Sequence, residues 1–233
     1  GSAGGTGFDY ATAWSFSVAE MATFFIPSFY GFGGATYWGN MPFTDYPNYM
    51  GIIILTLAVI GTLFHESKIK WYFLTTGLLA LLISFGKNFF LYEIFYDYFP
   101  YFNKFRVPAM FLILTQFSTA VLAGMGLDIA SKWIISNQTY GSLKKLAWVV
   151  GGVLFIIIGL KFMLAGDTDY GSRSHPILNK LRADMLSRDM MKSIVFLFIG
   201  SGAFYMSRMG WIGRQVLAGI IISTSVLDMG IVN

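Results

Sequence analysis

The chain of 233 residues contains no cysteine and few charges. The absence of cysteine excludes a disulfide scaffold, catalysis by a thiolate, and metal or iron–sulfur sites built on Cys ligands. Only 12% of the residues are charged and 55% are hydrophobic, whereas an ordinary soluble domain carries about 25% charged residues. Together with 23 Phe, 13 Tyr and 12 Met, this excludes soluble globular, disordered and coiled-coil chains. Composition therefore predicts a polytopic helical membrane protein.

The first 48 residues lack Lys and Arg, and contain no apolar stretch long enough to cross a bilayer. Ser17-Val18-Ala19-Glu20 matches a capping box, and the apolar run that follows it stops before Pro27. We expect residues 1–48 to form an outer-face loop. It carries a short amphipathic helix from about Val18 to Ile26, which lies on or dips into the membrane interface. The chain starts without Met and without a signal-peptide pattern, from which we expect an internal fragment of a longer protein.

Six apolar stretches follow, and each approaches the roughly 20 residues that cross about 30 Å of hydrocarbon. They lie near residues 47–64, 71–86, 107–127, 146–165, 192–207 and 211–229. The sequence therefore predicts an all-α fold, a transmembrane helix bundle of about six spans over residues 49–233. Tilt, flanking aromatic residues or local thinning of the bilayer would compensate for the shorter stretches.

Basic residues in three short connections predict how the bundle is oriented. These residues are Lys68 and Lys70, then Lys132, Lys144 and Lys145, and finally Arg208 and Arg214. The positive-inside rule places these connections in the cytoplasm, and tryptophans at the ends of the neighbouring spans resemble an aromatic belt on the same face. We therefore expect a multi-pass protein with both ends of the chain outside. The net charge of +4 is explained by this distribution, so no nucleic-acid partner is expected.

The outer connection between the second and third spans places cations beside aromatic residues. Three cations and two amides are candidates for binding a lipid phosphate: Lys87, Lys104, Arg106, Asn88 and Asn103. Pro108 suits the first turn of the next helix, so a phosphate at this depth would meet cations, amides and a helix N-terminus together. The alternative is that the cations snorkel and only anchor the helix ends among the headgroups.

Carboxylates and aromatic side chains on the outer face are further candidates. The stretch Leu91–Phe99 either lies flat as an interfacial helix or stacks against sugar rings. A catalytic carboxylate needs a shaped, partly dry pocket, and Asp9 and Glu20 are the candidates. Glu20 also has a structural explanation as the capping partner of Ser17.

The sequence offers little support for a metal site. Asp167-Thr168-Asp169 has the Asp-x-Asp spacing of some divalent-cation sites, but this spacing arises easily by chance and also fits a loop turn. His65 and His175 are predicted on opposite sides of the membrane. No cofactor is therefore expected, apart from a divalent cation at Asp167 and Asp169 as the alternative.

Four blocks of sequence carry a resemblance to a known family. They are Trp14-Ser15-Phe16-Ser17 with Glu20, Phe25-Ile26-Pro27-Ser28-Phe29-Tyr30-Gly31, Leu82-Ile83-Ser84-Phe85-Gly86-Lys87-Asn88, and Pro100-Tyr101-Phe102-Asn103-Lys104-Phe105-Arg106-Val107-Pro108. In order and spacing they resemble the YfhO-like integral membrane proteins of bacteria, over nearly the whole chain. That family is similar to the GT-C class of glycosyltransferases, which take a sugar from a polyprenyl-phosphate carrier on the outer face and pass it to a cell-envelope acceptor.

The resemblance implies a location, partners and roles. The location is the bacterial cytoplasmic membrane, and the partners are the bilayer, a polyprenyl-phosphate-linked sugar and a glycopolymer or glycolipid acceptor. The chain would supply the carrier-binding part, while the catalytic acid would lie upstream of it. Trp14, Tyr96 and Tyr101 are the aromatic candidates for contacting substrate.

Two other functions remain as alternatives to a glycosyltransferase. A transporter or flippase of lipid-linked envelope precursors would need a two-sided pathway, and the thin cytoplasmic loops and absence of charge at span centres argue against one. A non-catalytic membrane scaffold is the third hypothesis.

Overall fold

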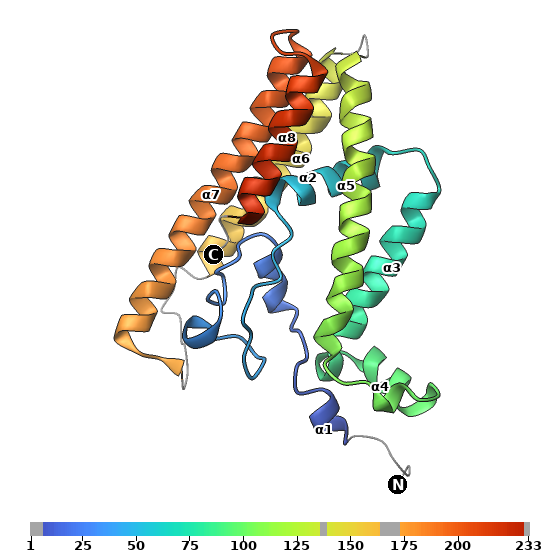
Figure 1. Ribbon diagram of the computed structural model, residues 1–233, viewed down its shortest axis with the longest axis vertical. Helices are drawn as coiled ribbons and strands as arrows, with labels where there is room; N and C mark the ends of the chain where they lie inside the picture. Colours follow the sequence, from blue (N-terminus) through green and yellow to red (C-terminus); the bar gives the residue numbers. More distant parts are fainter. Residues whose placement is uncertain (1–6, 136–138, 164–172, 231–233) are drawn as a thin grey trace.

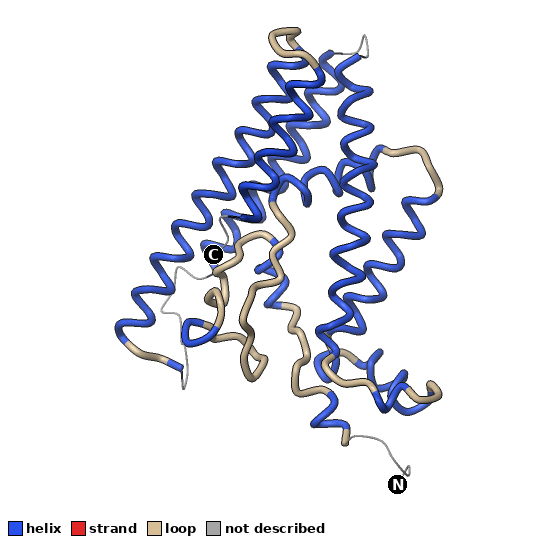
Figure 2. Tube along the Cα trace, viewed as in Figure 1, coloured by secondary structure: helices blue, strands red, loops and turns tan. Residues whose placement is uncertain are grey.

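The computed structural model describes residues 7–135, 139–163 and 173–230, and every regular element in these ranges is a helix (Figure 2). Four long helices run along the long axis of the molecule (Figure 1). They are α5 (Leu112–Ile135), α6 (Thr139–Met163), α7 (Pro176–Arg208) and α8 (Arg214–Gly230). The predicted all-α fold is confirmed for this part of the chain.

Three helical segments are long and apolar enough to cross a membrane: Pro108–Ile135, Gly141–Met163 and Pro176–Arg208. Two shorter apolar helices, α2 (Ile52–Phe64) and α3 (Ile69–Ser84), precede them in the chain. Each of the six predicted stretches thus overlaps a helix, and the long apolar helices indicate a membrane protein. Six crossings remain a prediction.

Helix α2 crosses α5 at a point where glycines let the two backbones touch (Figure 1). A Cβ atom added to Gly61 would lie 2.1 Å from the carbonyl oxygen of Leu122, and one added to Gly126 would lie 1.9 Å from that of Leu57. Small residues allow such close approach between helices in a bilayer. This contact joins the two arms of the molecule: one is formed by α3 and α5, the other by α6, α7 and α8 (Figure 1).

Helix α7 is longer than the predicted 192–207 span and begins within the connection between the fourth and fifth predicted stretches. Its 33 residues correspond to about 50 Å of helix, well beyond about 30 Å of hydrocarbon. Pro176 occupies its first turn, where a missing N–H costs nothing. In the polar first half of α7, the side chains of Arg182 and Asp189 are buried by tertiary contacts. These contacts stabilise the helix there, and hydropathy does not reveal them.

The N-terminal segment runs between the two arms at the lower end of Figure 1. It contains α1 (Phe8–Ala11) and two short 3₁₀ helices, Ala19–Phe24 and Gly34–Thr36. The expected amphipathic interfacial helix is therefore shorter and of a different type. Phe24 packs in a core with Phe16, Phe85 and Leu112. The reason for the difference is that this apolar segment is covered by α3 and α5 instead of lying on the surface.

The connection from α3 to α5 closes the lower end of that arm. After the 3₁₀ turn Gly86–Asn88 comes α4 (Phe90–Tyr98), which lies across the arm in Figure 1. Two further 3₁₀ turns, Phe102–Lys104 and Pro108–Phe111, lead into α5.

Candidate functional site

Three of the sequence blocks singled out above meet at the lower end of the α3–α5 arm. The N–H of Phe16 donates to the carbonyl of Ser84, at 2.9 Å. The N–H groups of Val107 and Ala109 donate to the carbonyls of Ala11 and Trp14, at 3.1 and 3.2 Å. Backbone hydrogen bonds thus hold the N-terminal segment between the end of α3 and the start of α5.

A tight turn at Gly86 brings the Lys87 region against the N-terminal segment. Gly86 has φ of +50°, and a Cβ atom there would lie 2.0 Å from the Ser15 hydroxyl. That hydroxyl accepts the N–H of Lys87 at 3.0 Å. The side-chain amide of Asn88 donates to the carbonyl of Phe16 at 2.8 Å. Asn88, a predicted phosphate-binding residue, therefore also helps to hold the N-terminal segment in place.

The three predicted cations are exposed at this end of the arm. Arg106 donates from Nη1 to the Tyr10 hydroxyl at 2.7 Å, and its guanidinium lies 5.4 Å from the centre of the Tyr10 ring. The Lys104 ammonium lies 5.0 Å from the centre of the Tyr101 ring. Among the residues that the structure describes, no carboxylate forms an ion pair with Lys87, Lys104 or Arg106. We call these three side chains, with Tyr10 and Tyr101, the cation–aromatic surface.

The backbone that presents Lys104 and Arg106 is strained at both ends. Tyr101 and Val107 have φ of +64° and +59°, values in the left-handed region. For a β-branched residue such as Val107 this is a true outlier, and each such residue costs on the order of 1 to 3 kcal/mol. Strain of this kind persists where the surroundings hold it, and it is concentrated at ligand-binding segments.

The aromatic candidates differ in accessibility. Tyr101 is 73% exposed. Tyr96 packs edge-on against Phe8 at 5.2 Å, and Trp14 packs edge-on against Phe43 at 5.4 Å, measured between ring centroids. Tyr101 is the most available of the three for stacking against a ligand.

The two catalytic candidates lie in different environments. Asp9 is exposed on α1, next to Tyr10. Glu20 is 1% exposed and completes the predicted capping box. Its Oε2 accepts the N–H of Ser17 at 3.0 Å, and its own N–H donates to the Ser17 hydroxyl at 3.2 Å.

The other oxygen of Glu20 accepts the hydroxyl of Tyr37, which in turn accepts the N–H of Met41 at 2.9 Å. Burial raises the pKa of Tyr37 above its ordinary value, and the hydrogen bond to Glu20 and the charge of that carboxyl raise it further. Both carboxylate oxygens of Glu20 are therefore occupied by donors from the fold.

The Asp167 and Asp169 pair lies outside the described residues. Within them, no group of three or more His, Asp or Glu side chains is placed to hold a metal ion. Asn103 lies in the 3₁₀ turn beside Lys104 and is half-buried.

Two features of the fold are missing from the sequence-based prediction. Asp228, near the end of α8, caps the start of α2: its Oδ2 accepts the N–H of Ile52 at 2.8 Å and its Oδ1 accepts the Tyr49 hydroxyl at 2.8 Å. Arg173 and Arg182 hold the loop around Tyr37: Arg173 donates to the carbonyls of Tyr37 and Met41 at 3.3 and 3.2 Å, and Arg182 donates to that of Thr36 at 2.8 Å. Their only signal in the sequence is charge close to a proline, Pro176, which does not specify a partner.

Comparison with known proteins yields no relative: no family model, curated protein or solved structure matches the chain.

Proposed function

We propose that the chain is the carrier-binding part of a bacterial membrane glycosyltransferase of the GT-C type. In this proposal, Lys87, Lys104 and Arg106 bind the phosphate of a polyprenyl-phosphate-linked sugar on the outer face of the cytoplasmic membrane. A glycopolymer or glycolipid of the cell envelope receives the sugar.

The observation that carries the proposal is the cation–aromatic surface itself. Lys104 and Arg106 lie over tyrosine rings, and Arg106 also donates to a tyrosine hydroxyl. Among the described residues, none of the three cations forms an ion pair with a carboxylate. A phosphate at a low-dielectric boundary needs paired cations, because burying an unpaired charge is costly. An Arg guanidinium also matches two phosphate oxygens in one plane.

The surroundings of the surface suit a lipid-linked ligand. Helix α4 beside it exposes Phe90, Ile94 and Tyr98, the kind of side chains that settle at a membrane interface. Tyr101 offers a ring on which a sugar can stack. Of the two carboxylates, Asp9 is the accessible one, because both oxygens of Glu20 are engaged.

Carrier binding in nanodiscs tests the proposal. We expect Arg106→Ala and Lys87→Ala to weaken the affinity for a polyprenyl-phosphate sugar by about tenfold or more, since each removes a charge-assisted contact. Arg106→Lys should bind with intermediate affinity. Lys70→Ala is the matched control, because Lys70 also lies over a ring, that of Trp71 at 5.3 Å, but near the other end of α3. Wild-type affinity in both Arg106→Ala and Lys87→Ala would reduce these cations to headgroup anchors.

A further inference from the structure

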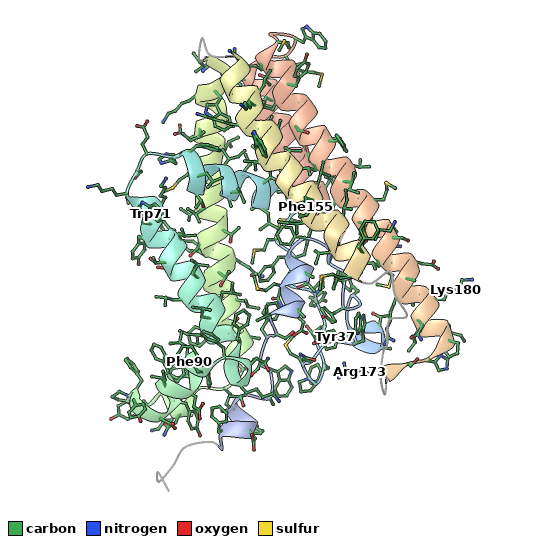
Figure 3. The ribbon with its side chains drawn as sticks, turned by 180° about the vertical axis from the view of Figure 1, so that it is seen from behind. Tyr37, Trp71, Phe90, Phe155, Arg173 and Lys180 are labelled. Atoms are coloured by element: carbon green, nitrogen blue, oxygen red, sulfur yellow. The ribbon has the colours of Figure 1, made fainter. Side chains whose placement is uncertain are left out.

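Helix α6 carries an open groove along one of its faces. The groove has a volume of about 750 Å³, which includes open space at its mouth, and is lined by Lys144, Ala147, Trp148, Gly151, Gly152 and Phe155. Figure 3 shows the side of the molecule on which α6 lies, with Phe155 labelled. Most of these residues are three or four positions apart, so they share one face of the helix.

The other face of α6 packs into the protein. Val149, Val153 and Ile157 are buried, and they follow one another at intervals of one helical turn. Only 17% of the apolar part of α6 is buried, against 33% in the Pro108–Ile135 segment and 39% in α7. An apolar helix that leaves most of its surface uncovered meets lipid there. The groove therefore lies on the part of α6 that faces acyl chains.

Two aromatic rings stand on either side of a hollow whose floor is made by glycines. Trp148 and Phe155 are 74% and 78% exposed, and they lie two turns apart on the same face. A Cβ atom added to Gly151 or Gly152 would meet nothing within 4 Å, so the space above the backbone between the rings is free. A flexible acyl chain can bend into this hollow and gain contacts with both rings.

Lys144 lies at one end of the groove, near the start of α6. Its side chain is exposed, and no carboxylate in the described part of the chain forms an ion pair with it. The next residue, Lys145, is directed elsewhere: its ammonium lies 5.3 Å from the centre of the Phe64 ring and 5.8 Å from that of the Trp133 ring. Lys144 is thus available to a headgroup at this groove.

We propose that the groove binds one anionic phospholipid, with its phosphate on Lys144 and an acyl chain in the hollow between Trp148 and Phe155. A net-negative headgroup complements a lysine that has no carboxylate partner, and basic residues near the ends of spans attract anionic lipids. The lengths agree, because roughly 16 Å of helix separates Lys144 from Phe155 and one leaflet contributes about 15 Å of hydrocarbon. The site lies on the other arm from the cation–aromatic surface and does not depend on it.

A second copy of the chain fits the groove less well. Small residues on one face allow two helices to pack closely, but the exposed rings of Trp148 and Phe155 stand on either side of the glycines and keep another backbone away. Two copies in one membrane share the same orientation, so a two-fold contact at this face would also bring two Lys144 side chains to the same depth. Like charges brought together in this way oppose association.

Quenching by brominated lipids tests the proposal with the whole chain in nanodiscs of phosphatidylcholine. Bromine on an acyl chain quenches a tryptophan that it contacts, and the difference between wild type and Trp148→Phe isolates the signal of Trp148. We expect brominated phosphatidylglycerol to quench Trp148 at about fivefold lower mole fraction than brominated phosphatidylcholine, a preference that one lysine near the membrane surface provides. Equal quenching by the two lipids would overturn the proposal. So would a Trp148 that neither lipid quenches, because a second copy or another protein would then cover the groove.

Charge variants separate a built site from a basic membrane surface. Lys144→Gln should reduce the preference for phosphatidylglycerol to below about twofold. Lys145→Gln removes the same charge at almost the same depth, but from above two rings, and should retain most of the preference. Equal losses in the two variants would overturn the proposal. Arg106→Ala should behave like wild type, which separates this site from the carrier site.

Filling the hollow tests the contact with the acyl chain. Gly152→Leu adds a side chain where a Cβ atom meets nothing within 4 Å, so it occupies the hollow without displacing the protein. We expect the preference to fall by at least about twofold although Lys144 is intact, because the acyl chain loses its contacts. Gly159→Leu is the matched control beyond Phe155, at another position where a Cβ atom meets nothing within 4 Å, and should behave like wild type. An unchanged preference in Gly152→Leu would overturn the assignment to the groove.

Discussion

Two buried carboxylates show how single residues connect segments that are far apart in the sequence. Glu20 ties the 3₁₀ turn after Ser17 to Tyr37, and Asp228 ties the end of α8 to the start of α2. In both cases the carboxylate accepts a backbone N–H and a tyrosine hydroxyl. Charge-assisted hydrogen bonds of this type compensate for burying the carboxylate, and removing either partner would leave the other unsatisfied. Both residues therefore have roles in holding the fold.

At high pH, Tyr37 should limit the stability of the protein. Its pKa is raised by burial and by Glu20, and that of Tyr30 is raised by the same two causes. Above about pH 10 an unfolded tyrosine loses its proton while the folded one keeps it, so the folded state binds more protons and becomes less stable as the pH rises. Each such tyrosine contributes at most about 1.4 kcal/mol per pH unit.

Unfolding measurements between about pH 9 and pH 11 check this expectation. Tyr37→Phe should show a shallower loss of stability with pH than wild type. Tyr98→Phe, which removes the hydroxyl of an 83% exposed ring, is the control and should follow wild type. Parallel pH profiles for all three proteins would contradict the assignment to Tyr37.

At the scale of elements, the glycine contact between α2 and α5 should be sensitive to a single methyl group. Gly126→Ala places a Cβ atom 1.9 Å from the Leu57 carbonyl oxygen, so the helices must separate. We expect a loss of about 1 to 3 kcal/mol in the free energy of unfolding, as for other overpacked interiors. Gly124→Ala on the same helix meets nothing within 4 Å and should change stability by less than about 1 kcal/mol. Unfolding in detergent with increasing SDS compares the two, and equal effects would contradict the close contact.

Hydropathy predicted the positions of the helices, and the Ser-x-x-Glu motif predicted the capping box at Ser17 and Glu20, because both signals depend on neighbouring residues. Hydropathy underestimated α7, since the helical state of its polar half depends on Arg182 reaching the carbonyls of a distant loop. The cap that Asp228 provides for Ile52 is equally non-local. Pairings of this kind are fixed by tertiary packing, which a single sequence does not specify. The same holds for the site: the cations were visible in the sequence, but the N-terminal segment that completes their surface with Tyr10 was not.

At the scale of the whole molecule, the two ends differ in how polar groups are arranged. The lower end of Figure 1 carries the N-terminal segment, α4 and the polar half of α7. Among the described residues, the upper end carries the short turn between α7 and α8. This asymmetry fits the proposal that the carrier phosphate is bound on one side of a membrane.

Labelling of single cysteines can decide which end faces the cytoplasm. At the upper end Lys132 and Arg208 directly flank long apolar helices, as the positive-inside rule expects of cytoplasmic connections. At the lower end Lys180 and Arg182 lie on the polar half of α7, away from its apolar part. We therefore predict that an impermeant thiol reagent labels Ser187→Cys and spares Met209→Cys in intact spheroplasts. Both positions are exposed, so both should react after permeabilisation. The opposite labelling pattern would invert the orientation and place the proposed carrier-phosphate site in the cytoplasm.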